Sequence, residues 1–249
     1  MDIFNIPLYY ISFHKNQDLE DNYKKHGFTN IHHFKAVDGK KFKPLDLLQD
    51  KLITTRCYED LIKGRSSFKG MPSVGAIGCT MSHNELWKLC INNNLPYIII
   101  VEDDSRIRKN LTVKNIQDIR DAITEPNGIF VSAHITQGKY NVTKDIFGTK
   151  FFGTQLYFAS NSACHVMSKN CFPIDIQTDC YISHLSDIGS LKITGYKLDY
   201  VAHHMSSIQD SNYLLYILPK NPLYYIIVAC IVILILSYFL FRCKRSLKK

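Results

Sequence analysis

The sequence of 249 residues has no C-x-x-C motif, although it contains eight cysteines at irregular spacings. These spacings argue against a zinc ribbon or a small disulfide-rich scaffold, so we expect the thiols to be scattered in a hydrophobic core. The chain also lacks an internal repeat, a low-complexity block and a long linker before Pro219. Hydrophobic and aromatic residues occur throughout, which excludes fibrous and intrinsically disordered proteins.

The chain is basic, with 30 Lys and Arg against 22 Asp and Glu and a formal net charge of +8. Five of these positive charges lie in residues 242–249, which leaves +3 for the rest of the chain. No basic stripe with interleaved aromatic residues occurs outside this tail, so we expect no nucleic-acid partner.

A run of nineteen uncharged residues, 223–241, directly precedes the basic tail. As a helix it would be about 28 Å long, close to the roughly 30 Å hydrocarbon core of a bilayer. Tyr224, Tyr225 and Tyr238 near its ends favour the membrane interface. A buried core helix is the alternative. The sequence therefore predicts a domain over 1–218, a linker at 219–222, a transmembrane helix in the lipid bilayer at 223–241 and a basic tail at 242–249.

Two sequence features favour opposite orientations of this predicted single-pass protein in the membrane. The N-terminus lacks the basic segment and long apolar run of a signal peptide, which favours a cytosolic domain with a C-terminal tail anchor. The basic tail favours a translocated domain, in which the sequons at Asn110 and Asn141 would be usable. We favour the tail anchor, in an endomembrane or, for a viral protein, in a host membrane.

Short apolar runs alternate with longer mixed segments, which predicts an α/β layered domain. Residues 45–65 are ambiguous, and 63–73 resemble a mobile loop. The run at 97–101 is fully apolar, as expected in the middle of a parallel sheet covered on both faces. We expect strands at 8–13, 31–37, 97–101, 129–133 and 156–159, and helices at 19–26, 78–92, 116–123 and 163–168, the last with Asn161 or Ser162 as N-cap.

Three consecutive carboxylates, Glu102, Asp103 and Asp104, follow the apolar run. They repel one another, and they lie at the carboxyl end of a strand, where ligands bind in open α/β sheets. Because side chains alternate along a strand, Glu102 and Asp104 are expected on one face. Hard oxygen ligands suit Mn²⁺ or Mg²⁺, which commonly also hold substrate phosphates. The pattern indicates a divalent-metal site, with a solvated acidic turn as the alternative.

Residues 75–87 read G-A-I-G-C-T-M-S-H-N-E-L-W, and the three carboxylates begin fifteen residues after Trp87. This arrangement resembles glycosyltransferase family 25, the lipooligosaccharide and collagen galactosyltransferase group. Its signature is G-E-I-G-C-x-x-S-H-x-x-x-W followed by a strand that ends in E-D-D. Residues 36–39 (A-V-D-G), 153–160 and 172–175 (F-P-I-D) also resemble family segments, so the resemblance covers about residues 5–210.

The resemblance implies a GT-A type fold, a Rossmann-like, mostly parallel sheet flanked by helices. It also implies transfer of galactose or glucose from a UDP-sugar to a glycan, lipid or protein hydroxyl with Mn²⁺ or Mg²⁺. The cation would stabilise the charge on the leaving UDP, and an inverting transfer needs a carboxylate base. The implied residues are Asp175 and then Asp179 as base, Asp103 and Asp104 as metal ligands with His203 or His204, and Gly78, Ser82, His83 and Glu102 as nucleotide contacts.

Two departures from the family pattern leave a second hypothesis open. Ala76 stands where the signature has Glu, and no Arg precedes Arg56, so Lys15 or Lys24 is left to face phosphate. The alternative is a catalytically inactive relative that binds glycans or acts as a membrane interaction protein. Cys79 and His83 have a zinc-like i, i+4 spacing, but two ligands without partners make a poor site, and we expect no zinc there.

Overall fold

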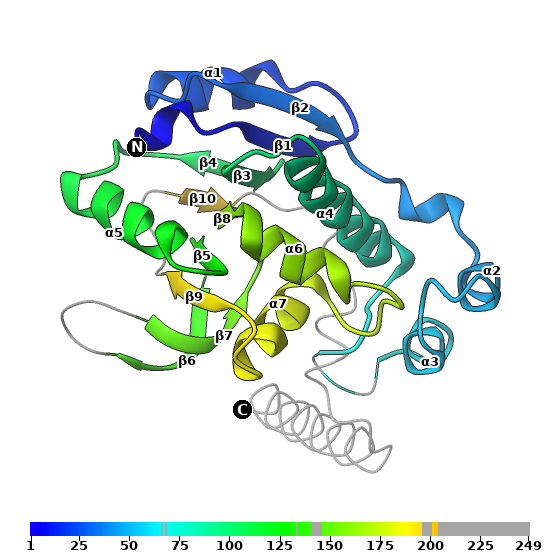
Figure 1. Cartoon of the computed structure of the whole chain (residues 1–249). Helices are drawn as coiled ribbons and strands as arrows, with labels where there is room; N and C mark the ends of the chain where they lie inside the picture. The colour runs from blue at the N-terminus through cyan, green and yellow to red at the C-terminus, as the bar shows by residue number, and fades with distance from the viewer. Residues whose placement is uncertain (66, 68, 133, 141–145, 196–200, 204–249) are drawn as a thin grey trace, which may run out of the picture. The chain divides into compact units, whose positions relative to one another are not determined.

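A six-stranded sheet with the order β2-β1-β3-β8-β5-β9 forms the centre of the computed structural model (Figure 1). The structure describes residues 1–65, 67, 69–132, 134–140, 146–195 and 201–203. β1 is parallel to β2 and β3, and β5 is parallel to β9, whereas β8 is antiparallel to both β3 and β5. The expected α/β fold with a mostly parallel sheet is confirmed, with one antiparallel strand in it. The strands are β1 (Leu8–Ser12), β2 (Ile31–Lys35), β3 (Tyr97–Glu102), β5 (Gly128–Val131), β8 (Leu156–Ser160) and β9 (Lys192–Gly195).

Helices cover both faces of the sheet because side chains of its strands alternate between two cores. Ile98 and Ile100 of β3 pack with α4 (Val74–Asn92), α6 (Asn161–Lys169) and α7 (Thr178–Asp187). Ile99 and Val101 pack on the opposite face with α1 (Gln17–Lys25) and α5 (Val113–Thr124). All four β3 residues are fully buried, which explains the unbroken apolar run in this strand.

Helix α4 begins at Val74, four residues before the predicted start, because Ser73 caps it. The Ser73 side chain accepts a hydrogen bond from the Ala76 N–H at 3.3 Å. Gly78 lies against the backbone of residues 37–39, where a Cβ atom would meet the Val37 carbonyl oxygen at 2.5 Å. Ser82 fixes the same contact, since its hydroxyl donates to the Gly78 carbonyl and accepts from the Val37 N–H, both at 2.8 Å. The A-V-D-G and G-x-I-G-C segments therefore form one packed unit.

Other elements differ from the sequence-based predictions. Helix α6 is capped by Ser160, and not by Asn161 or Ser162. The ambiguous segment 45–65 forms two helices, and a hairpin that the sequence did not predict follows β5. The remaining elements are η1 (Ile3–Asn5), η2 (Gly39–Lys41), α2 (Pro44–Gln49), α3 (Thr55–Lys63), β4 (Ser105–Ile107), the hairpin β6 (His134–Tyr140) and β7 (Ile146–Phe152), and β10 (Val201–His203).

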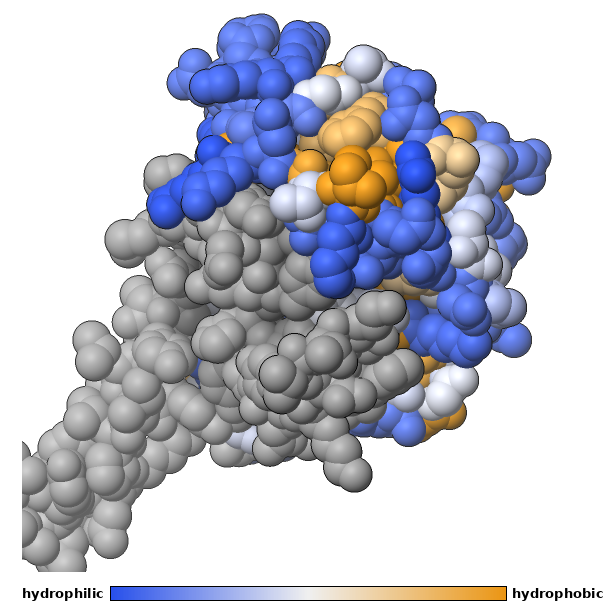
Figure 2. All heavy atoms as spheres, turned by 90° about the vertical axis from the view of Figure 1, so that its left-hand side faces the viewer, coloured by the Kyte–Doolittle hydropathy of each residue, from blue (hydrophilic) through white to orange (hydrophobic). Residues whose placement is uncertain are grey.

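The predicted linker (219–222), transmembrane helix (223–241) and basic tail (242–249) lie outside the described residues, as does the predicted domain end at residue 218. Within the part that the structure describes, no helix is long and apolar enough to cross a membrane. The coloured part of the face in Figure 2 is mostly hydrophilic, with hydrophobic side chains near its upper centre and a few more along its right side.

Candidate functional site

The carboxyl ends of β1, β2 and β3 lie at one edge of the sheet, because these strands are parallel. Ser12 pairs with Lys35 at this edge, and Ile11 pairs with Glu102. The antiparallel strand β8 begins at the same edge, where Leu156 pairs with Val101. The residues before β8 therefore meet the residues after the parallel strands. Ligands commonly bind at such an edge in α/β proteins.

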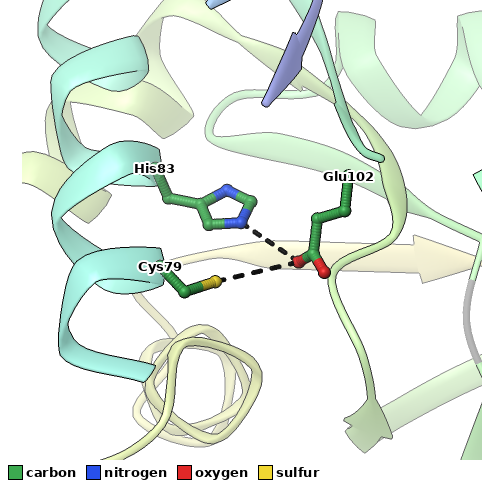
Figure 3. Close-up of side chains that lie close together, drawn as sticks. All are labelled: Cys79, His83 and Glu102. Atoms are coloured by element: carbon green, nitrogen blue, oxygen red, sulfur yellow. Dashed lines mark hydrogen bonds and ion pairs between the residues drawn. The ribbon is translucent and has the colours of Figure 1, made fainter. Parts of the chain in front are cut away.

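The Glu102 carboxylate contacts the side chains of Thr154, His83 and Cys79, the last two of which are drawn in Figure 3. Its Oε1 atom accepts a hydrogen bond from the Thr154 hydroxyl at 2.5 Å and lies 3.2 Å from His83 Nε2 and 4.0 Å from Cys79 Sγ. Cys79 and His83 are one turn apart on α4, and both point toward Glu102. The expectation that this pair lacks a third metal-binding partner is therefore wrong, because β3 brings Glu102 to it.

His83 is fully buried and held from its other side. Its Nδ1 atom lies 2.8 Å from the Tyr157 hydroxyl, which accepts a hydrogen bond from Trp87 Nε1 at 2.9 Å. The Trp of the motif thus fixes Tyr157, and Tyr157 fixes the imidazole against Glu102. A role for His83 in anchoring the helix to the sheet follows directly from these contacts, while the predicted nucleotide contact stays a prediction.

A turn at Asp103 and Asp104 ends the strand, so the alternation that predicted a common face for Glu102 and Asp104 stops at Glu102. Asp104 is only 6% exposed, and its Oδ1 atom has no hydrogen-bond partner among the described residues. Burial, followed by the charges of Glu102 and Asp103, raises the pKa of Asp104 to about 7. Burial also raises the pKa of Asp103. A buried carboxylate oxygen without a donor fits a bound cation.

The backbone of His203 lies close to these acids. β10 pairs antiparallel with β4, and His203 is opposite Ser105, the residue after Asp104. That a downstream His completes the metal shell stays a prediction. The side chain of His203 and the whole of His204 lie outside the described part of the chain.

Asp179 is joined to Glu102 through two consecutive residues. Asp179, in the first turn of α7, accepts hydrogen bonds from the Gly153 N–H at 2.9 Å and the Cys180 N–H at 2.7 Å. The next residue, Thr154, donates to Glu102. Gly153 has a φ of 87°, a conformation that side chains other than Gly rarely adopt. Burial raises the pKa of Asp179, and burial followed by the charges of Glu102 and Asp179 raises that of Cys79.

Asp175 has different partners. It accepts a hydrogen bond from the Thr54 hydroxyl at 2.5 Å, and both its oxygens pair with Arg56 of α3. It lines a cavity of about 250 Å³ together with Thr80, Tyr181 and others. The structure therefore brings Asp179 to Glu102 and pairs Asp175 with Arg56, a contact across 119 positions that no sequence signal indicated.

Two adjoining cavities of about 510 and 230 Å³ lie where β1 and β2 end. We call them together the β1–β2 groove; Cys79 and Ser82 line its smaller part. The predicted contact Gly78 instead packs on the backbone of residues 37–39. The groove carries basic side chains that the sequence analysis did not single out, although two of them directly follow the A-V-D-G segment. Lys24, which the sequence analysis did consider as a phosphate contact, pairs instead with Glu20 on α1. These groove side chains are His14, Lys35, Lys40 and Lys41.

The family model "Glycosyltransferase family 25 (LPS biosynthesis protein)" matches residues 5–153. A glycosyltransferase 25 family member of Drosophila melanogaster is 35% identical over 74 residues, which are 30% of this chain and 11% of that protein. Another, of Drosophila pseudoobscura pseudoobscura, is 29% identical over 92 residues, 37% of this chain and 14% of that protein. The matched segments thus span about a seventh or less of these relatives.

A solved structure of a Drosophila β1,4-galactosyltransferase 7 mutant, in complex with manganese, UDP-Gal and xylobiose, has a TM-score of 0.41 with this chain. It is 11% identical, over 88% of this chain and 81% of that chain. The family model covers more than half of the chain, including the segment 75–87 and the three carboxylates. The chain therefore belongs to glycosyltransferase family 25.

Proposed function

We propose that this protein is a metal-dependent glycosyltransferase that moves galactose or glucose from a UDP-sugar to an acceptor hydroxyl. The observation that carries the proposal is the buried Asp104 Oδ1, which has no partner among the described residues and lies at the sheet edge beside Glu102 and Asp103. Family membership supports sugar transfer. Asp103, Asp104 and His203 would hold Mn²⁺ or Mg²⁺, and such an ion, when bound, neutralises charge that develops on the leaving diphosphate.

The β1–β2 groove is our candidate for the donor site. Its larger cavity, about 510 Å³, lies within the usual range for small-molecule pockets. Lys35, Lys40 and Lys41 bring positive charge to the groove, as a diphosphate requires. Ser82 and Cys79 line the end of the groove formed by α4.

As catalytic base we propose Asp179 in preference to Asp175. Asp179 accepts a hydrogen bond from Gly153, and the next residue, Thr154, donates one to Glu102, so Asp179 lies close to the proposed metal site. Burial raises the pKa of Asp179, which suits proton abstraction. Both oxygens of Asp175 are already engaged by Arg56, and one of them also by the Thr54 hydroxyl. In an inverting transfer the acceptor oxygen bonds to the anomeric carbon, the bond from that carbon to the UDP oxygen breaks, and the hydroxyl proton passes to the carboxylate.

The test is UDP-hexose turnover by the full chain with and without Mn²⁺, in the wild type and in Asp103→Asn/Asp104→Asn. We expect turnover to depend on the metal and to fall at least about a hundredfold in the double variant. Asp118→Asn/Asp121→Asn on α5 removes two carboxylates away from this edge and is the matched control. Metal-independent turnover, or activity that survives in the first double variant, would contradict the proposal.

The base is tested separately. Asp179→Asn should lower kcat by about a hundredfold or more while the KM for the donor changes little, whereas Asp175→Asn should retain most activity. The reverse order would assign the base to Asp175.

Ala76 favours a second candidate function, a catalytically inactive relative that binds glycans or membrane partners. Its side chain packs in the small core between α2, α3 and α4, where the family signature places a carboxylate. Calorimetry of the full chain with UDP and Mn²⁺ separates the two candidates. Binding supports the transferase, and no binding at millimolar UDP supports the inactive relative.

We also propose that residues 223–241 anchor the chain in a bilayer, an endomembrane or a viral host membrane, with a glycan, lipid or protein as acceptor. The uncharged run and its basic flank support this. Fractionation of cells that express the full chain or residues 1–218 tests it, since only the full chain should remain in carbonate-washed membranes.

A further inference from the structure

Cys79, His83 and Glu102 offer three different metal-binding atoms in one place (Figure 3). These atoms all lie within 4.8 Å of one another, with 3.2 Å from His83 Nε2 and 4.0 Å from Cys79 Sγ to Glu102 Oε1. Around one tetrahedral Zn²⁺, bond lengths of about 2.0 to 2.3 Å place ligand atoms roughly 3.3 to 3.6 Å apart. The three side chains therefore need to move only slightly to reach one ion.

We propose that these three residues form a Zn²⁺ site, separate from the site for a hard cation at Asp103 and Asp104. A thiolate and an imidazole favour Zn²⁺ over Mn²⁺ or Mg²⁺, which prefer oxygen ligands. The proposal stands on this cluster alone and does not depend on sugar transfer.

Outer contacts orient the ligands, as they do in protein zinc sites. The Tyr157 hydroxyl lies 2.8 Å from His83 Nδ1 and turns Nε2 toward Glu102. Tyr157 is itself held by Trp87, and Glu102 is held by Thr154. His83, Trp87 and Tyr157 are fully buried, so the imidazole is fixed before any ion arrives.

The surrounding charge also favours a cation. Glu102, Asp179 and Asp104 are all close enough to Cys79 to act on it electrostatically. When Zn²⁺ binds, bonds form to Sγ, Nε2 and a Glu102 oxygen, and the thiol proton of Cys79 passes to solvent. Zinc binds the neutral form of an imidazole, whose proton would then lie on Nδ1 toward Tyr157. Each ion therefore releases one proton.

The β1–β2 groove gives the ion a route of entry, because Cys79 is only partly buried and lines it. With three protein ligands, a tetrahedral ion keeps a fourth position for water or a groove ligand. An ion bound by Cys79, His83 and Glu102 would therefore lie at the wall of the β1–β2 groove.

The test uses Co²⁺, a spectroscopic substitute for Zn²⁺, titrated into the full chain. We expect one equivalent to give the charge-transfer absorption of a cobalt–thiolate bond, and one equivalent of Zn²⁺ to remove it. Cys79→Ser should abolish this band, whereas Cys180→Ser, which changes a buried cysteine of α7, should retain it. Circular dichroism verifies that each variant is folded. No band in the wild type, or a band that survives in Cys79→Ser, would overturn the proposal.

Two further measurements separate this site from the others. Calorimetry in buffers of different ionisation enthalpy should give one proton released per Zn²⁺, and Tyr157→Phe should weaken Zn²⁺ affinity by about ten- to a hundredfold. Asp103→Asn/Asp104→Asn should retain the cobalt band while it loses Mn²⁺-dependent turnover. Loss of the band in that variant would mean that the two metal sites are not separate, which would overturn the proposal.

Discussion

The sharpest prediction concerns Asp104, whose burial makes its negative charge costly to the fold. Its pKa rises from the ordinary value of 3.8 to about 7, chiefly through burial and then through Glu102 and Asp103. At about 1.4 kcal/mol for each tenfold change in proton affinity, this difference corresponds to about 4 kcal/mol. The folded state binds the proton more tightly than the unfolded chain. The contribution of this group to stability is therefore complete below pH 3.8 and lost as the pH rises to about 7.

Asp104→Asn removes this titration. In EDTA, the free energy of unfolding of the variant relative to the wild type should rise by about 2.5 kcal/mol between about pH 5 and about pH 8. Urea unfolding followed by tryptophan fluorescence measures it cleanly, because Trp87 is the single tryptophan and is fully buried. Asp121→Asn, at an exposed position of α5, is the control and should show no such rise.

Mn²⁺ should narrow the difference in stability between the two proteins at about pH 8. At a hundred times its Kd the ion should stabilise the wild type by about 2.7 kcal/mol and leave Asp104→Asn nearly unchanged. A stability difference that is the same at both pH values, or a variant that Mn²⁺ stabilises as much as the wild type, would refute the reasoning.

Three further predictions test the packing and the groove. Gly78→Ala should destabilise the fold by about 1 to 3 kcal/mol in urea unfolding, because its Cβ would meet the Val37 carbonyl oxygen at 2.5 Å; a neutral result would mean that the two segments separate easily. Tyr157→Phe leaves buried groups of Trp87 and His83 without their partner and should cost about 1 to 3 kcal/mol in the same assay. Lys35→Ala/Lys40→Ala should weaken UDP binding in calorimetry by about tenfold or more, while Lys192→Ala, which removes an exposed lysine paired with Glu125, should leave it unchanged. Equal affinities in all three proteins would place the diphosphate elsewhere.

The sequence predicted those parts of the fold in which a local residue pattern is compatible with only one kind of structure. The apolar run at 97–101 is a buried central strand, and the acids after it lie at the sheet edge, because a strand buried on both faces needs continuous apolar side chains. Helix α4 was predicted from the spacing of its apolar residues, but its start was placed four residues late, since the first turn after the Ser73 cap carries no such pattern.

The missed features depend on contacts between distant segments. The direction of β8 decides that Thr154 reaches Glu102, and no local pattern distinguishes an antiparallel strand from a parallel one in a fully buried segment. The same holds for Arg56 and Asp175, which meet through the bridge between Ile53 and Ile174. The approach of Glu102 to Cys79 and His83 was missed because it too joins distant segments, α4 and β3.

The antiparallel strand β8 limits how this site can change in evolution. A parallel strand in its place would carry Gly153 and Thr154 to the opposite edge, roughly 16 Å away for five residues at about 3.3 Å each. Tyr157 packs on the face of α4 and Phe158 on the face of α5. A single-residue insertion in β8 would exchange these two faces and take the hydroxyl away from His83. Length changes within the five residues of this strand should therefore be poorly tolerated.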